Sequence, residues 1–191
     1  MLAYLFLCAS WLIGVLAMPS FEGVTSWSSI GSLVPGMTAL EALGPSASGH
    51  ASDEPGQSPF YFSIDAPHGL TGNATVKKAR VPPLFYIHGA QLFNYHNAST
   101  IYPVQVVNGT RAEGMPLQIV VGTPRGDVVR GGTWRWQGTQ LFYELGTANN
   151  GGVYYGCQNA DGLMGLFLFL RGSPTPPGCT LFTVHSFMRR G

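Results

Sequence analysis

Cys157 and Cys179 are the pair of residues whose type and spacing first suggest chemistry. A redox-active pair is normally arranged as Cys-x-x-Cys, and these two cysteines lie much farther apart. A zinc site would need two further Cys or His ligands; His185 follows Cys179 by six residues, but no fourth candidate has the usual spacing. In an exported chain that has lost Cys8 with its leader, an even pair of cysteines favours a structural disulfide.

The acidic residues and histidines offer acid–base chemistry, but their spacing selects no pair. Glycosidases need two carboxylates a few ångströms apart. The acidic residues that could in principle supply such a pair are Asp65, Glu113, Asp127, Glu144 and Asp161. His88 and His96 flank one expected hairpin and could meet for an RNase-like mechanism, although solvated turn histidines are the commoner outcome. The chain has no G-x-S-x-G, H-E-x-x-H or phosphate-binding Gly loop. We therefore expect no catalytic residues, no metal and no cofactor.

Trp134 and Trp136 are the aromatic residues with the clearest pattern. They alternate along one expected strand, so both side chains point to the same face. The simpler interpretation places both in the core. The alternative is an exposed platform on which sugar rings stack, while neighbouring Asn and Gln side chains bond the sugar hydroxyls.

Residues 1–17 have the layout of a secretory signal peptide. The stretch from Leu2 to Leu16 is apolar without a charged side chain, and cleavage is expected after Ala17. The alternative, a membrane anchor, is disfavoured because a spanning helix needs about 20 apolar residues. The C-terminal sequence HSFMRRG has no hydrophobic tail, so we expect no lipid anchor. The sequence thus predicts a secreted, extracellular protein without a membrane anchor.

The composition narrows the class of partner. Charged residues make up 10% of the chain and the formal net charge is +1, against about 25% charged residues in a typical globular domain. A nucleic-acid-binding domain carries a basic surface, so we expect no nucleic-acid partner. Three glycosylation sequons, at Asn73, Asn97 and Asn108, agree with secretion and mark positions expected at the surface.

The chain divides at about residue 58. Ser, Gly and Pro dominate residues 18–58, which we interpret as a partly flexible N-terminal segment. Within it, the sequence MTALEALG favours one or two helical turns ended by Gly44 and Pro45. From residue 59 to 191, short apolar or alternating runs are separated by turn residues. They predict a single all-β domain of about nine short antiparallel strands, folded as a barrel, a trefoil-like barrel or a sandwich.

Two hairpins are the clearest local units of the expected domain. LFYIHGAQLFNYH, residues 84–96, turns at His88-Gly89-Ala90, where Gly89 supplies the positive φ of a tight turn. GTWRWQGTQLFYELG, residues 132–146, turns at Gly138. The other expected strands lie in residues 60–64, 116–122, 151–157, 165–172 and 179–187. Gln-Leu-Phe follows the Gly turn in both hairpins, which indicates either an internal repeat or a coincidence.

Four stretches carry a family resemblance: the two hairpin sequences, VYYGCQ, and GLFLFLRGSPTPPGCTLFTVHSF. In their order and cysteine spacing, residues 59–187 resemble the fungal phialide cell-wall protein family, also called PhiA-like secreted proteins. The opening FYFSIDAPHGLTGN differs, because it lacks the Ser-Gly-Ser expected after the first strand. The resemblance implies a secreted, wall-associated fungal glycoprotein without catalytic residues, in which Cys157 and Cys179 are paired.

These observations favour a secreted, non-enzymatic glycoprotein that associates with the fungal cell wall and binds wall polysaccharide or a wall protein. Two other classes stay open on the sequence. One is a small secreted hydrolase or nuclease acting through carboxylates or histidines. The other is a secreted effector that binds a host protein. A cleft with converging ionisable groups would favour the hydrolase, and an aromatic face would favour the polysaccharide-binding protein.

Overall fold

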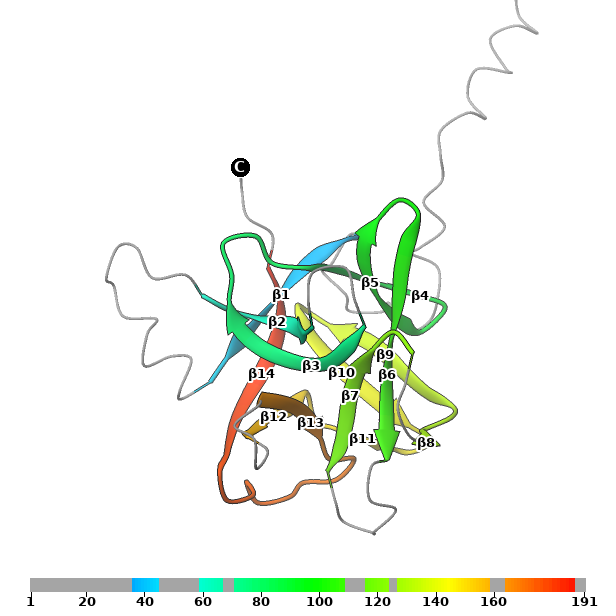
Figure 1. Cartoon of the computed structure of the whole chain (residues 1–191). Coiled ribbons are helices and arrows are strands. Elements are labelled where there is room, and N and C mark those ends of the chain that lie inside the picture. The colour runs from blue at the N-terminus through cyan, green and yellow to red at the C-terminus, as the bar shows by residue number, and fades with distance from the viewer. Residues whose placement is uncertain are drawn as a thin grey trace, which may run out of the picture.

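The computed structural model describes residues 36–44, 59–66, 71–108, 116–123, 127–158 and 164–187 (Figure 1). Within these ranges the chain is all-β, with fourteen strands and one disulfide. The strands are β1 (Thr38–Leu43), β2 (Phe60–Asp65), β3 (Gly72–Lys78), β4 (Leu84–His88), β5 (Gln91–Asn97), β6 (Thr100–Asn108), β7 (Leu117–Val121), β8 (Asp127–Val128), β9 (Gly132–Gln137), β10 (Gln140–Leu145), β11 (Ala148–Asn149), β12 (Val153–Gln158), β13 (Met164–Leu168) and β14 (Cys179–Phe187).

Eight of these strands close into a barrel. Each pairs antiparallel with the next in the order β1, β4, β5, β6, β7, β13, β12 and β14. The ring closes because β14 pairs with β1 over five residues, from Ala39 opposite Phe187 to Leu43 opposite Thr183. In Figure 1, β14 runs beside β1 and continues toward β12. Closure leaves no free edge in the ring, which removes the templates for pairing with another chain.

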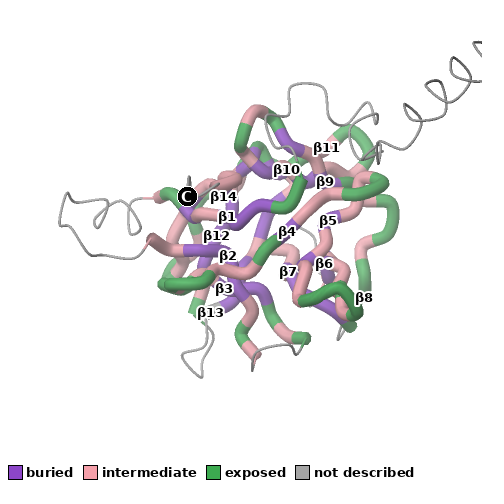
Figure 2. The backbone as a smooth tube through the Cα atoms, turned by 90° about the horizontal axis from the view of Figure 1, so that it is seen from above, coloured by how far each residue is buried: buried purple, intermediate pink, exposed green. Residues whose placement is uncertain are grey.

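Two hairpins complete the core of the barrel. The β2–β3 hairpin also links β1 to β7. Glu41 of β1 pairs with Tyr61 of β2, and Gly72 of β3 pairs with Val121 of β7. The β9–β10 hairpin attaches to β14 where Gln140 pairs with His185. It contributes four buried side chains to the core: Trp134, Trp136, Leu141 and Tyr143. Figure 2 shows the buried positions alternating with less buried ones along the strands, as the period-two geometry of a strand requires.

The turns of two hairpins follow directly from their residues. Gly89 and Ala90 form the two-residue loop between β4 and β5, with φ of 56° and 62°. Positive φ at both loop residues is the type I′ geometry that matches the twist of the flanking strands. Gly138 has a φ of 59° in the β9–β10 loop, where Gln137 pairs with Gln140. The predicted hairpins and the role of Gly89 are therefore confirmed.

The disulfide between Cys157 and Cys179 joins directly opposite residues of β12 and β14. The predicted pairing is thus confirmed. The bridge closes β12, β13 and the connection before β14 into one covalent unit, in which residues 171–178 are mostly exposed. With a sequence separation of 22 residues, it restricts the unfolded chain enough to stabilise the fold by about 3 kcal/mol on the entropy model.

The expectation of a helix at MTALEALG was wrong. Thr38–Leu43 is the strand β1, and five of its residues pair with β14. Alanine, leucine and glutamate favour helices locally, but a strand here buries Leu40 and Ala42 in the core and closes the barrel. Tertiary packing overrides the local preference. The boundary at residue 58 is corrected with it, because the β-domain includes β1. Residues 1–35 and 45–58 lie outside the described residues.

The estimate of about nine strands was too low. The five strands that were missed are β1, β3, β6, β8 and β11. Two of these, β8 and β11, are only two residues long. Strand β3 contains Asn, Thr and two Lys, a composition typical of a loop. The barrel alternative is confirmed and the sandwich is not. The two similar hairpins hold different places in the fold, since β4–β5 belongs to the closed barrel and β9–β10 packs beside it.

Candidate functional site

The described surface has a groove of about 450 Å³. It lies where β2, β3, the β3–β4 connection, the start of β4, β5 and β6 meet. Its lining residues are Ser63, Ile64, Ala66, Lys77, Ala79, Val81, Pro82, Pro83, Leu84, Asn94, Tyr95, His96 and Tyr102. The groove thus combines an apolar rim from the β3–β4 connection with hydroxyl, amide, imidazole and ammonium groups. This mixture is typical of a binding site that fixes the orientation of a polar ligand.

A β-bulge gives the groove its polar wall. The β5–β6 register shifts between Tyr95 and Asn97, so His96 is the extra residue. Consecutive residues of a regular strand point to opposite faces, yet Asn94, Tyr95 and His96 all line the groove. A bulge bends the strand and re-aims side chains, which accounts for His96 lining the groove next to Tyr95. Asn94 and Tyr95 keep the regular register with β4 and β6. Asn94 is buried, and its Nδ2 atom donates a hydrogen bond of 3.1 Å to the carbonyl oxygen of Leu84.

Lys77 supplies the charge of the groove. Its Nζ atom donates a hydrogen bond of 2.9 Å to the carbonyl oxygen of Ile64, across the β2–β3 hairpin. An ammonium group has three donors, so this bond leaves two for a ligand. No Asp or Glu is among the lining residues. The groove therefore carries a positioned positive charge and has no carboxylate in its lining.

An aromatic face continues from the groove over the outer side of β4, β5 and β6. Tyr86 and Phe93 stack with ring centroids 5.4 Å apart and planes at 20°. In the register, Tyr95 lies between Leu84 and Ile101. Ile101 is 46% exposed and Val81, on the groove rim, is 89% exposed. The groove rim at Val81 and the surface at Ile101, next to Tyr95, are therefore apolar and open to solvent.

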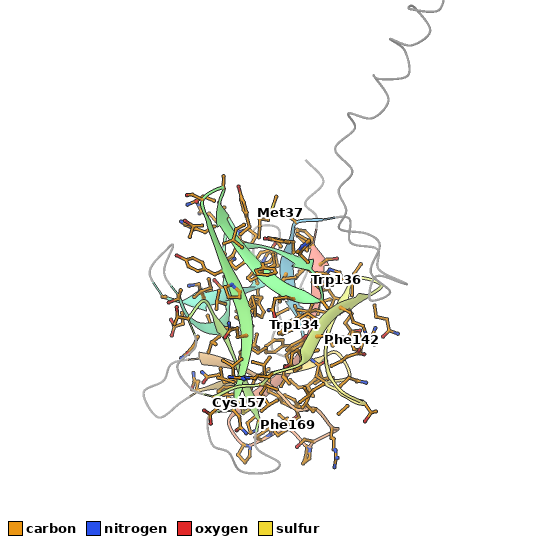
Figure 3. All side chains as sticks on the ribbon, turned by 90° about the vertical axis from the view of Figure 1, so that its right-hand side faces the viewer. Met37, Trp134, Trp136, Phe142, Cys157 and Phe169 are labelled. Atoms are coloured by element: carbon orange, nitrogen blue, oxygen red, sulfur yellow. A yellow bond between two sulfur atoms is a disulfide. The ribbon has the colours of Figure 1, made fainter. Side chains whose placement is uncertain are left out.

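The predicted platform at Trp134 and Trp136 was wrong. The two residues are 1% and 5% exposed and belong to the core. Figure 3 shows both labelled tryptophans on the hairpin side of the barrel, among packed side chains. Trp134 contacts Tyr143, with ring centroids 4.9 Å apart. Because β9 lays this face on the barrel, the rings cannot reach a sugar. The simpler interpretation, that both are core residues, is confirmed.

The histidine pair does not form. His88 ends β4 at the turn, whereas His96 lies at the far end of β5. Gln91, the partner of His88, lies five positions before His96, which amounts to roughly 17 Å along a strand. The suggested RNase-like arrangement is therefore wrong. His96 lines the groove and His88 is exposed at the hairpin turn.

The described carboxylates are also dispersed. Glu41, Asp65, Asp127 and Glu144 lie on four different strands, and none is opposite another in the register. The ion pair of Glu144 and Arg135 holds its atoms 2.6 Å apart, and the Arg135 guanidinium also lies 4.8 Å from the Phe142 ring centroid. Glu144 thus serves the β9–β10 hairpin. Glu113 and Asp161 lie outside the described residues.

His185 and Glu41 form a second polar site, on the outer face where β14 meets β1. They are opposite each other in the register. The His185 Nδ1 and Nε2 atoms lie 3.2 Å and 2.9 Å from the hydroxyl oxygens of Thr139 and Thr183. Burial lowers the pKa of His185 and raises the pKa of Glu41. Both ring nitrogens are engaged within the protein, so this site holds strands together.

Two tyrosines that face the core have hydroxyl groups with strongly raised pKa values. Burial raises the pKa of Tyr143 to about 12. Burial also raises the pKa of Tyr154, against a smaller opposing effect of Asn150. The Tyr154 hydroxyl donates a hydrogen bond of 3.0 Å to the carbonyl oxygen of Leu141. Both hydroxyls therefore stay protonated, and neither opens into the groove.

The sequons differ in their surroundings. Asn73 is exposed on β3, and Asn97 is exposed at the end of β5, directly after His96 of the groove. The Asn97 Oδ1 atom accepts hydrogen bonds from the Ser99 amide at 3.0 Å and the Ser99 hydroxyl at 2.8 Å. Asn108 is half-buried at the end of β6, and the two residues after it lie outside the described residues.

Five polar or aromatic residues of the groove were not predicted from the sequence: Ser63, Lys77, Asn94, Tyr95 and Tyr102. One signal was available: Asn94 lies two residues after the core residue Leu92, on the same face of β5, and an amide at such a buried position indicates a special role. Among the residues that the structure describes, no three His, Cys, Asp or Glu gather as metal ligands. The described ranges also contain no helix long and apolar enough to cross a bilayer.

No protein-family model, curated protein or solved structure matches the chain. The resemblance to PhiA-like proteins stays a prediction from the sequence.

Proposed function

We propose that the chain is a secreted, non-enzymatic glycoprotein of the fungal cell wall, and that the groove binds wall polysaccharide. The signal-peptide pattern, the three sequons and the PhiA-like resemblance support this proposal. The disulfide is compatible with it, because structural disulfides persist in oxidising extracellular surroundings.

One observation carries the polysaccharide part of the proposal. The groove places the Tyr95 and Tyr102 side chains beside hydrogen-bonding groups and an exposed aliphatic rim. A sugar ring has an apolar face of C–H groups and an edge of hydroxyls, so it needs an aromatic or aliphatic surface with donors and acceptors around it. Asn94, His96 and Lys77 line the same hollow as the two tyrosines.

The dispersed carboxylates favour binding over cleavage. Hydrolysis of a glycosidic bond needs two carboxyl groups within about 5–9.5 Å of each other on either side of the bond. The groove has no carboxylate in its lining, and the described carboxylates lie on separate strands. We therefore propose retention of the polymer without turnover.

Retention on insoluble chitin and β-glucan tests the proposal. We expect the protein to be retained on at least one wall polymer. Tyr95→Ser should weaken retention about three- to tenfold, because an aromatic contact contributes about 0.5–1.5 kcal/mol. Tyr86→Ser is the matched control: Tyr86 lies on the same outer face and stacks on Phe93 but does not line the groove.

Three results would contradict the proposal. The first is no retention on any wall polymer. The second is equal weakening by both tyrosine variants, which would place the contact outside the groove. The third is hydrolysis in a glycan and RNA substrate screen that is abolished by His96→Ala, which would instead assign an enzyme. Each variant is checked by its thermal unfolding, so that loss of retention is not confused with loss of the fold.

A further inference from the structure

We infer that the groove selects a negatively charged polysaccharide, whose anionic group binds Lys77. This inference rests on the proposed function and narrows its ligand class. The chain has a formal net charge of +1 and 10 Lys and Arg residues in all. Lys77, Lys78 and Arg80 fall within four consecutive positions, at the end of β3 and in the connection that forms the groove rim.

The position of Lys77 is fixed by the fold. Tyr61 and Lys77 are opposite each other in the β2–β3 register, and the Lys77 Nζ atom is held 2.9 Å from the Ile64 carbonyl oxygen. A positioned ammonium loses little further side-chain freedom when a ligand arrives, so its charge is available at a low entropic cost. Arg80 is exposed between Ala79 and Val81, both of which line the groove.

No acidic side chain neutralises this positive charge within the lining. The nearest acid along the chain is Asp65, exposed at the end of β2 beside the lining residue Ala66. The structure shows no ion pair between Asp65 and Lys77. A neutral sugar would use the tyrosines and amides of the groove and leave the charge of Lys77 unused. A carboxylate or phosphate on the sugar would meet it.

Lys78 provides an internal control. It neighbours Lys77 in sequence, but its Nζ atom lies 5.3 Å from the ring centroid of Phe60, and neither residue lines the groove. Substituting either lysine removes the same charge from the same strand. A general electrostatic attraction would respond equally to both substitutions, whereas a bound anion in the groove would respond to Lys77.

Calorimetric titration with two oligomers of the same length and β-1,4 linkage tests the inference: a glucose oligomer and its glucuronic acid counterpart. We expect the unchanged protein to bind the glucuronic acid oligomer about tenfold more tightly at low salt. The preference should shrink as salt rises from about 0.01 M to about 0.15 M, because the screening length falls from about 30 Å to about 8 Å. A second arm with a phosphorylated oligomer distinguishes carboxylate from phosphate as the preferred anion.

The variants then locate the anion. Lys77→Gln should abolish the preference for the glucuronic acid oligomer, because the substitution removes the ammonium group that meets the anion. Lys77→Arg should restore the preference, and Lys78→Gln should retain most of it. Equal affinity of the unchanged protein for charged and neutral oligomers, with binding still dependent on Tyr95, would overturn the inference and leave the proposed function standing. Loss of preference in Lys78→Gln as large as in Lys77→Gln would also overturn it. Failure to bind any oligomer or wall polymer would overturn both.

Discussion

At the scale of single residues, Asn150 shows how a buried polar side chain defines a corner of the fold. Its Oδ1 atom accepts hydrogen bonds from the amides of Tyr143 at 3.0 Å and Gly152 at 3.1 Å. Its Nδ2 atom donates to the carbonyl oxygen of Val153 at 3.1 Å. The side chain thereby satisfies backbone groups between β10 and β12 that would otherwise be buried without partners. This corner sets the position of Tyr154, and hence of the strand that carries Cys157.

Asn150→Ala should lower the free energy of unfolding by about 3 kcal/mol. The substitution leaves the buried amides of Tyr143 and Gly152 without an acceptor, and each unsatisfied group costs about 1–3 kcal/mol. Asn149→Ala is the matched control, because the Asn149 Oδ1 atom accepts a single bond from Gly151 at 2.8 Å in an exposed turn. We expect it to cost less than about 1 kcal/mol. Urea unfolding of both variants measures the difference, and equal losses would contradict the role assigned to burial.

At the scale of elements, hairpins with a strong local signal were predictable and elements held by partners far away in sequence were not. The β4–β5 and β9–β10 hairpins combine apolar runs with a glycine turn, so the sequence located both. In contrast, Thr38–Leu43 has a helical composition, and its strand state depends on β14, which lies far along the chain. Likewise, the bulge at His96 comes from the β5–β6 register and has no sequence signature. The groove was unpredictable for the same reason, since five strands and a connection build it.

The β4–β5 turn predicts a stabilising substitution. Among the described residues, Ala90 is the only one other than glycine with positive φ. The left-handed conformation costs an L-residue about 1–2 kcal/mol, which glycine avoids. Part of this gain is offset, because the greater conformational entropy of glycine stabilises the unfolded chain by about 0.4–1 kcal/mol. Ala90→Gly should therefore raise the free energy of unfolding by about 0.5–1 kcal/mol.

The β5–β6 turn supplies the control for this substitution. Ala98 occupies that turn and has no positive φ. Ala98→Gly gains nothing from relief of strain and should lower stability by about 0.4–1 kcal/mol. Urea unfolding of the two single variants should give changes of opposite sign. A loss of stability in both would show that Ala90 is unstrained.

At the scale of the whole molecule, the barrel is closed by segments far apart in sequence. β1 and β14 pair over five residues, and the disulfide fastens β14 to β12 on its other edge. His185 sits where β14 meets both β1 and β10, opposite Glu41 and Gln140. A change in the charge of His185 or Glu41 therefore affects the pairing of β14 with β1 that closes the barrel. This effect is measured as the pH dependence of the free energy of unfolding.

The direction of that pH dependence follows from the two pKa shifts. Burial lowers the pKa of His185 from 6.5, so the unfolded chain takes up its proton first. Stability then falls as the pH drops below 6.5, until it passes the lower pKa of the folded state. Burial raises the pKa of Glu41 from 4.5, so the folded chain holds this proton longer. The Glu41 effect has the opposite sign: stability falls as the pH rises from 4.5 through the raised pKa.

Substitution of each residue should remove one of these opposing effects. His185→Asn cannot take up the proton, so its stability should fall less than that of the unchanged protein between about pH 7 and about pH 5. Glu41→Gln stays neutral, so it should gain stability relative to the unchanged protein at neutral pH and lose that advantage below pH 4.5. Urea unfolding across this pH range measures both slopes. A slope in His185→Asn as steep as in the unchanged protein would mean that another group controls the acid sensitivity of the barrel closure.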